Sequence, residues 1–233
     1  AVLSFTLDTT IAAPSIGLDA DTGASATDGI TKTGTYTVSG TESGAVVEYS
    51  TDGVTWTTTA PTAVEGANTI QVRQTDVAGN VSAPATLTFT LDTTASLTVS
   101  LADVNATNAA AAALTGTTSG IEAGRTVTLV VSDGDPATAD VTVTATVGAD
   151  GSYSTTADVS ALSDGTLTVT ASVTDAAGNA ASATDTAALE TTIASPSIRL
   201  DADTGASATD SITTPTLIPA TSAIKPSPLP GSM

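Results

Sequence analysis

The sequence repeats itself, and this repetition restricts the chain to a tandem array of one small folding unit. Residues 7–31 return as residues 189–213 with only four substitutions. Between these copies, the motif Leu91-Asp92-Thr93-Thr94 matches the Leu-Asp-Thr-Thr and Leu-Glu-Thr-Thr with which they begin. The matches divide the chain into two complete units, residues 11–94 and residues 95–192.

Shorter segments flank the two complete units. Residues 1–10 match the end of the first unit, so we expect them to be the end of a preceding repeat and its linker. Residues 193–213 predict the start of a third repeat, truncated after one strand and a loop. Residues 214–233 hold five of the ten Pro residues. Because proline cannot donate to a sheet ladder, we interpret this tail as a linker or a cloning remnant.

Hydrophobic periodicity inside each unit predicts strands. Ala85, Leu87, Phe89 and Leu91 alternate with threonine, which gives one buried and one exposed face. The same alternation recurs in three further rows: Leu167, Val169, Ala171 and Val173; Val127, Leu129 and Val131; Val141, Val143, Ala145 and Val147. About seven short strands per unit indicate an all-β, immunoglobulin-like sandwich in each.

Turn residues separate these strands. Four Asp-Gly pairs predict tight hairpins, since both residues tolerate a positive φ: Asp52-Gly53, Asp133-Gly134, Asp150-Gly151 and Asp164-Gly165. The alanines at 109–113 are too few to nucleate a helix alone, so we expect a loop that runs into a strand.

Composition excludes several function classes. Acidic residues outnumber basic ones 24 to 5, which gives a formal net charge of -19. We therefore expect neither nucleic acid nor an anionic membrane as a partner. The sequence contains no Cys and no His, which excludes disulfides, thiol catalysis, the Ser-His-Asp triad and the usual zinc sites. The remaining carboxylates, hydroxyls and amides suit a hard cation such as Ca²⁺ better than covalent chemistry.

Five motifs resemble bacterial Ig-like tandem repeats of giant secreted adhesins of the biofilm-associated and RTX types. They are Leu18–Gly23, Asp28–Thr31, Tyr49–Trp56, Asp76–Ser82 and Leu91–Thr94. The match covers the first unit fully, the second more loosely and the third only over its opening. The resemblance implies type I secretion, display at the bacterial cell surface, calcium at the joints between repeats and a role as a stalk.

Sandwich geometry gives candidate calcium ligands at these joints. The first strand of a sandwich and its last hairpin turn end at opposite poles, so the first loop of one repeat meets the last turn of the next. Carboxylates gathered in one small volume repel each other unless a cation lies between them. We therefore predict a Ca²⁺ site between units from Asp19, Asp21, Asp28, Asp92, Asp175 and Asn179, with an upstream counterpart from Asp8, Asp76 and Asn80.

Other interpretations stay open. Asp-x-Ala-Gly-Asn at 76–80 and at 175–179 also suits a plain hairpin turn in which Asp caps backbone amides. The second unit departs from the pattern, with Asp103–Asn108 as its first loop and Glu190 at its end, which puts its calcium site in doubt. Trp56 could stack on a sugar, although packing against its own sheet is the commoner role of such a residue.

The sequence thus predicts a non-enzymatic, calcium-rigidified extender of an extracellular adhesin that takes part in adhesion and biofilm formation. Its expected partners are the neighbouring repeats of the same chain and, through other domains, a host or abiotic surface, with no membrane insertion and a monomeric state. A glycan- or protein-binding Ig-like module is one alternative. An accessory Ig-like region of a secreted polysaccharide-degrading enzyme is another.

Overall fold

The computed structural model describes residues 2–193 and residue 195, and β-strands are its main regular structure. The chain divides into a unit of residues Ala1–Thr192 and a unit of residues Ile193–Met233. The predicted third repeat (residues 193–213) and the proline-rich tail (residues 214–233) lie outside the described residues, apart from residues 193 and 195. Within the described part, no helix has the length and apolar character needed to cross a membrane.

The first repeat is a sandwich of unequal sheets. Its strands are β1 (Ser15–Leu18), β2 (Ile30–Thr31), β3 (Tyr36–Ser39), β4 (Val46–Ser50), β5 (Gly66–Thr75) and β6 (Ala85–Leu91). One sheet contains only the antiparallel pair β1–β3, and the other has the order β2-β6-β5-β4. Ile70, Phe89 and Leu91 form its buried apolar cluster.

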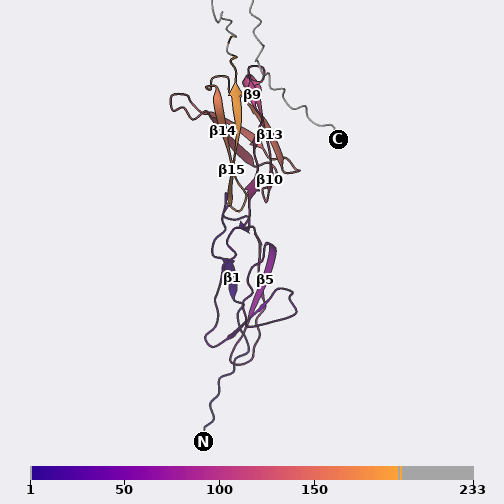
Figure 1. Cartoon of the computed structure of the whole chain (residues 1–233). Helices are drawn as coiled ribbons and strands as arrows, with labels where there is room; N and C mark the ends of the chain where they lie inside the picture. The colour runs from indigo at the N-terminus through magenta and orange to yellow at the C-terminus, as the bar shows by residue number, and fades with distance from the viewer. Residues whose placement is uncertain (1, 194, 196–233) are drawn as a thin grey trace, which may run out of the picture. The chain divides into compact units, whose positions relative to one another are not determined.

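The second repeat has the same plan with more strand. Its elements are β7 (Ser96–Leu97), β8 (Ser100–Leu101), β9 (Val104–Asn105), the 3₁₀ turn η1 (Ala109–Ala111), β10 (Ala112–Ser119), β11 (Thr126–Ser132), β12 (Val141–Thr146), β13 (Ser152–Ala157), β14 (Gly165–Thr174) and β15 (Ala180–Glu190). One sheet has the order β13-β10-β7, with β8 also on β10, and the other is β12-β11-β14-β15-β9. The long strands β14 and β15 lie side by side in Figure 1.

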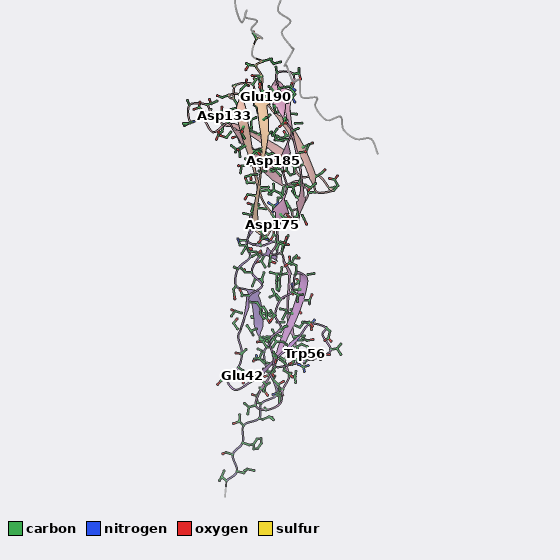
Figure 2. The ribbon with its side chains drawn as sticks, viewed as in Figure 1. Glu42, Trp56, Asp133, Asp175, Asp185 and Glu190 are labelled. Carbon is green, nitrogen blue, oxygen red and sulfur yellow. The ribbon has the colours of Figure 1, made fainter. Side chains whose placement is uncertain are left out.

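One feature of the topology is common to both repeats. A two-residue strand pairs in parallel with the last strand, as β2 does with β6 and β9 with β15. The first segment of each repeat thus contributes to both sheets and closes the sandwich. Figure 2 shows that Asp175 lies at one end of the second repeat and Glu190 at the opposite end. The last turn and the end of the last strand therefore mark the two poles, as the sequence predicts.

The predicted alternation is confirmed, whereas none of the four Asp-Gly pairs forms the tight hairpin that was predicted. Asp133-Gly134 begins the loop of residues 133–140 between the antiparallel neighbours β11 and β12. Asp52-Gly53 lies within residues 50–56, between Tyr49 and its bridge partner Thr57. Both loops are longer than a tight hairpin. Asp150-Gly151 and Asp164-Gly165 are not hairpins between paired strands. They connect strands of opposite sheets, β12 to β13 and β13 to β14. An Asp-Gly pair indicates a turn, but it specifies neither the length of the loop nor which strands pair.

The alanine run behaves partly as expected. Ala112 and Ala113 begin β10, whereas residues 109–111 form a single 3₁₀ turn rather than an open loop. The N–H of Ala111 donates to the carbonyl of Asn108 at 2.9 Å, and Ala109 is buried.

Candidate functional site: the joint between the repeats

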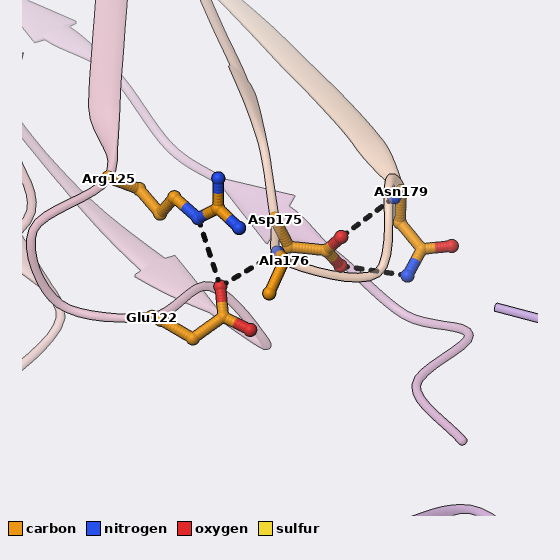
Figure 3. Close-up of polar contacts among 5 residues, drawn as sticks. All are labelled: Glu122, Arg125, Asp175, Ala176 and Asn179. Atoms are coloured by element: carbon orange, nitrogen blue, oxygen red, sulfur yellow. Dashed lines mark hydrogen bonds and ion pairs between the residues drawn. The ribbon is translucent and has the colours of Figure 1, made fainter. Parts of the chain in front are cut away.

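The turn at residues 175–179 is closed by its own side chains. Asp175 accepts from the backbone N–H of Asn179 at 2.7 Å through Oδ1 and from Asn179 Nδ2 at 2.8 Å through Oδ2. Figure 3 shows both carboxylate oxygens directed at Asn179. Asp175 is only 1% exposed, so these two bonds replace the water that burial removes. The turn chemistry considered for this motif is therefore present, whether or not a metal also binds.

The first repeat builds the same turn at residues 76–80. Asp76 accepts from the backbone N–H of Asn80 at 2.8 Å and from its Nδ2 at 2.7 Å. These hydrogen bonds, led by the one from the Asn80 side chain, lower the pKa of Asp76. Both Asp-x-Ala-Gly-Asn turns thus hold a carboxylate whose two oxygens accept hydrogen bonds from the Asn of the turn.

Each of these turns also holds the linker that precedes its repeat. Nδ2 of Asn179 donates to the backbone carbonyl of Asp92 at 2.9 Å, and Nδ2 of Asn80 donates to that of Asp8 at 3.2 Å. The predicted pairing of Asp8 with the turn at 76–80 and of Asp92 with the turn at 175–179 therefore exists through asparagine and main chain. The amide, rather than a carboxylate, makes this contact.

The first loop of the first repeat reaches across the joint. Oγ1 of Thr22 donates to the carbonyl of Ala177 at 2.6 Å, and Nζ of Lys32 donates to the carbonyl of Gly178 at 3.0 Å. Gly23 lies against the same turn with φ at 98°, and a Cβ there would collide with the carbonyl oxygen of Ala176. Only glycine permits this close approach of two backbones. The loop and the turn thus meet directly, through main-chain carbonyls on one side.

Acidic side chains surround the linker at this joint. Burial raises the pKa of Asp92, and the negative charges of Asp175, Glu65 and Glu122 raise it further. Glu122 accepts from the backbone N–H of Ala176 at 2.9 Å. Oε2 of Glu122 also lies 3.4 Å from Nε of Arg125 (Figure 3). The charged form of Asp92 is therefore disfavoured, and a cation beside it would relieve that.

The remaining predicted ligands have local partners. Asp19 accepts from Oγ1 of Thr37 at 2.6 Å, and Asp28 caps the N–H of Ile30 at 3.0 Å. Asp21 accepts from the N–H of Gly29 through Oδ2, whereas its Oδ1 is buried without a partner among the described residues.

We compared these side chains with the requirements of Ca²⁺, which takes six to eight oxygens. Within residues 2–193 and 195, no three acidic side chains come together closely enough to form a metal-binding group. The partnerless oxygen of Asp21 and the raised pKa of Asp92 nevertheless both favour a nearby cation. Asp21, with one oxygen lacking a hydrogen bond, and Asp92, with a raised pKa, are thus the acidic residues of the joint beside which a cation would be favourable.

Several residues of the joint escaped the sequence analysis. Thr22, Gly23 and Lys32 lie inside or just after the loop chosen for its aspartates, and nothing in their spacing distinguishes contact residues from loop residues. Glu65 and Glu122 were missed although each lies in a repeated segment: Glu65-Gly66 returns as Asp164-Gly165, and Ser39–Gly44 returns as Ser119–Gly124 with the acid in the same place. Lys32 carried one usable signal, because basic residues are so scarce in this chain that each is a candidate for pairing with its acids.

A hollow lies on the surface of the first repeat, away from the joint. It has a volume of about 420 Å³ and is lined by Tyr49, Asp52, Pro61 and several hydroxyl side chains. Trp56 does not line it, because the Trp56 ring packs under the guanidinium of Arg73, 4.1 Å from the ring centroid. The packing role considered for Trp56 is therefore the one observed.

Comparisons with solved structures give matches to parts of large adhesion proteins. One match is the crystal structure of a tetra-tandem repeat in the extending region of a large adhesion protein, with 28% identity over 76% of this chain and a TM-score of 0.43. This chain spans 49% of that structure's length. Another match is a part of a 1.5-MDa bacterial ice-binding adhesin, with 26% identity over 81% of this chain, 68% of that structure's length and a TM-score of 0.35.

Sequence comparison identifies the repeats. No curated protein matches the sequence. A family model described as a bacterial Ig-like domain matches twice, over residues 8–93 and residues 98–193. The two matches together cover most of the chain and follow the two sandwiches of the fold. The chain therefore belongs to the bacterial Ig-like domain family, in two tandem copies.

Proposed function

We propose that this chain is an extender segment of a large, secreted bacterial surface adhesin and that calcium stiffens the joint between its repeats. The observation that carries the proposal is the joint itself, where a loop, a linker and a turn meet among acidic side chains. Family membership and the similarity to the extending region of a large adhesion protein support the adhesin context. The segment would hold a separate binding domain away from the cell, without catalysis of its own.

The metal-free joint has only modest stability of its own. Three side-chain hydrogen bonds cross it, from Thr22, Lys32 and Asn179. A hydrogen bond contributes about 0.5–1.5 kcal/mol net, and ordering the side chains that make it costs a comparable amount. Repulsion around Asp92 opposes the contact further. We therefore expect a joint that samples several orientations when no cation is present.

A bound Ca²⁺ would shift this balance by supplying positive charge among the acids. In the proposal, Asp21 and Asp92 hold the ion, with Asp175 and Glu122 close enough to feel its field. Binding that favours the aligned joint stabilises it by about 1.4–2.7 kcal/mol when free calcium exceeds the dissociation constant 10- to 100-fold. Extracellular calcium modules bind at about 10⁻⁴–10⁻³ M. The joint would thus be loose in a calcium-poor cytosol before type I secretion and stiff outside the cell, where the adhesin would serve adhesion and biofilm formation.

Calcium titration followed by small-angle scattering and calorimetry tests this proposal. We expect the largest dimension to rise and its distribution to narrow between micromolar and millimolar calcium, and the melting temperature to increase. Asp92→Asn and Asp21→Asn should abolish both effects. Asp158→Asn is the matched control, because that carboxylate caps the turn at Ser160. Shape and melting temperature that ignore both calcium and chelator would overturn the calcium proposal.

A glycan-binding module is the second candidate, favoured by the hollow at Tyr49, Asp52 and Pro61. Hydroxyls, a carboxylate and an aromatic ring are the groups that bind sugars, and the volume falls within the range of small-molecule sites. A glycan array separates the candidates. Binding lost in Tyr49→Ala but kept in Asp92→Asn would favour the module.

A further inference from the structure

Asp164 holds the linker that leaves the second repeat. Its Oδ1 accepts from the backbone N–H of Thr191 at 2.8 Å and from the Thr191 hydroxyl at 2.7 Å. Its Oδ2 accepts in the same way from Thr192, at 3.1 and 2.7 Å. These four hydrogen bonds lower the pKa of Asp164 to about 2, led by those from the two hydroxyls. One carboxylate thus fixes two successive residues.

The first repeat has a weaker counterpart of this contact. Glu65 accepts from the backbone N–H of Thr93 at 3.1 Å and from the Thr93 hydroxyl at 2.9 Å. Its carboxylate does not reach Thr94, whose N–H is capped by Asp92 at 3.2 Å. Here two acids divide the linker between them.

Strand register explains why both acids face a linker. Gly66 pairs with Leu91, and Gly165 pairs with Leu189, each at the end of the antiparallel pair formed by the last two strands. The acid before each glycine therefore lies level with the end of the last strand, Glu65 with Asp92 and Asp164 with Glu190. Both glycines have positive φ, 89° for Gly66 and 147° for Gly165, which a side chain rarely permits. The acid-Gly pair and the Thr-Thr pair together form one structural motif.

The two repeats place the longer and the shorter acidic side chain at opposite positions, before the glycine and at the end of the last strand. The first combines the long Glu65 with the short Asp92, and the second combines the short Asp164 with the long Glu190. In the first, Asp92 is close enough to cap the linker and keeps one oxygen without a hydrogen bond among the described residues. In the second, Asp164 makes all four linker contacts, and both of its oxygens are fully used.

From this exchange we propose that the chain contains two kinds of linker clamp: Asp164 fixes the linker after the second repeat without a metal, whereas the linker after the first repeat is left to Glu65 and a cation-dependent Asp92. This inference deepens the proposed extender function and rests on it for the cation dependence of Asp92 and for the biological role, whereas the Asp164 clamp rests on the contacts described above. It gives the Thr-Thr pair of each linker a function: these threonines donate hydrogen bonds to an acidic side chain of the repeat that precedes them. The direction in which the chain leaves the second repeat would then be the same with and without calcium.

Amide exchange of Thr191 and Thr192 in the full chain with excess chelator tests the clamp. We expect both amides to exchange at least tenfold more slowly than in an unstructured peptide. Asp164→Ala should remove this protection while the amides of β14 and β15 stay protected. Glu190→Gln is the matched control, since that side chain makes no linker contact in the structure, and it should leave both rates unchanged.

The wild-type measurement decides even if Asp164→Ala fails to fold. Exchange of Thr191 and Thr192 at the unstructured rate in chelator, or protection that appears only with calcium, would overturn the clamp. The exchanged pair Asp164→Glu with Glu190→Asp should keep Thr191 protected and make Thr192 protection weaker. The result is independent of the calcium titration, because a joint that ignores calcium after the first repeat would leave the protection of Thr191 and Thr192 intact.

Discussion

The two repeats share a strand arrangement but differ in their interiors. The second repeat buries a continuous cluster of twenty apolar residues, among them Leu114, Leu129 and Leu167. The first repeat has a cluster of three, Ile70, Phe89 and Leu91, beside partly buried neighbours. Since apolar burial is the main favourable contribution to folding, the second repeat should be much the more stable of the two.

The first repeat buries polar side chains where the second repeat buries apolar ones. Its buried polar residues are Thr31, Ser50, Gln74, Asp76 and Ser82, whereas Asp175 is the one described in the second. Gln74 joins the segment before β1 to the loop between β3 and β4, because Oε1 accepts from the N–H of Glu42 at 2.8 Å and Nε2 donates to the carbonyls of Ala12 and Gly40. Hydrogen bonds of this kind specify one arrangement but contribute less than apolar burial.

The comparison shows how one fold can serve two mechanical roles. A repeat with a large apolar core is stable by itself, and its linker is held by its own Asp164. A repeat with a small, polar interior depends more on what contacts its ends. We therefore expect the first repeat to gain more from calcium and from its neighbour than the second does.

The largest effect should come from removing a core side chain of the first repeat. Phe89→Ala deletes a third of its apolar cluster and should cost about 3–5 kcal/mol, which is enough to unfold a marginal domain. Trp56 is the only tryptophan, so its fluorescence reports unfolding of this repeat alone.

Leu129→Ala is the matched variant in the second repeat and should cost about 2–5 kcal/mol while leaving that repeat folded. Equal loss of structure in both variants would contradict the difference in stability.

The buried glutamine gives the next largest effect. Gln74→Ala removes the three hydrogen bonds between the buried Gln74 amide and the backbone of Ala12, Gly40 and Glu42, each worth about 0.5–1.5 kcal/mol. Thermal unfolding monitored at Trp56 should move to lower temperature, with no change in the melting of the second repeat. A neutral Gln74→Ala would mean that solvent already reaches this interior.

A smaller, local effect is expected at the joint. Gly23→Ala introduces both an unfavourable positive φ, worth about 1–2 kcal/mol, and a collision with Ala176. Gly79→Ala is the matched control, because it carries the same strain at φ 91° in open space. We expect Gly23→Ala alone to uncouple the repeats, measured as faster independent tumbling of each by NMR relaxation. Equal coupling in both variants would show that this contact does not hold the joint.

The smallest effect concerns pH. Because the pKa of Asp92 is raised in the fold, its charge opposes folding once the pH exceeds the folded-state pKa, and this cost disappears below the unfolded value of about 3.9. In chelator, the first repeat should gain slightly from acidification through this group. Asp92→Asn should stabilise it slightly at neutral pH and remove that part of the pH dependence. A destabilised Asp92→Asn in chelator would show that the charge is needed without a metal.

The fold could be predicted further than the site. The alternation of Leu167, Val169 and Ala171 with threonine predicts a strand with one buried face, and the repeated motifs predict where each unit begins and ends. Strand pairing around Asp150 and Asp164 was mispredicted, since a turn sequence does not encode which sheet follows. The aspartates of the joint were identified by type, but their contacts were not, because Asn179, Thr22 and Gly23 act through backbone carbonyls that leave no mark in composition.

The distance between the two repeats is the most direct test of the account. The chain has no cysteine, so spin labels at Thr88→Cys and Thr170→Cys, both exposed strand positions, report it without background. We predict a broad distance distribution in chelator that becomes narrow at millimolar calcium. In the Asp92→Asn variant, the distribution should stay broad in chelator and in calcium. A distribution equally narrow in chelator and in calcium would contradict a calcium-stiffened joint and leave the direct contacts of Thr22, Gly23 and Lys32 as its sole basis.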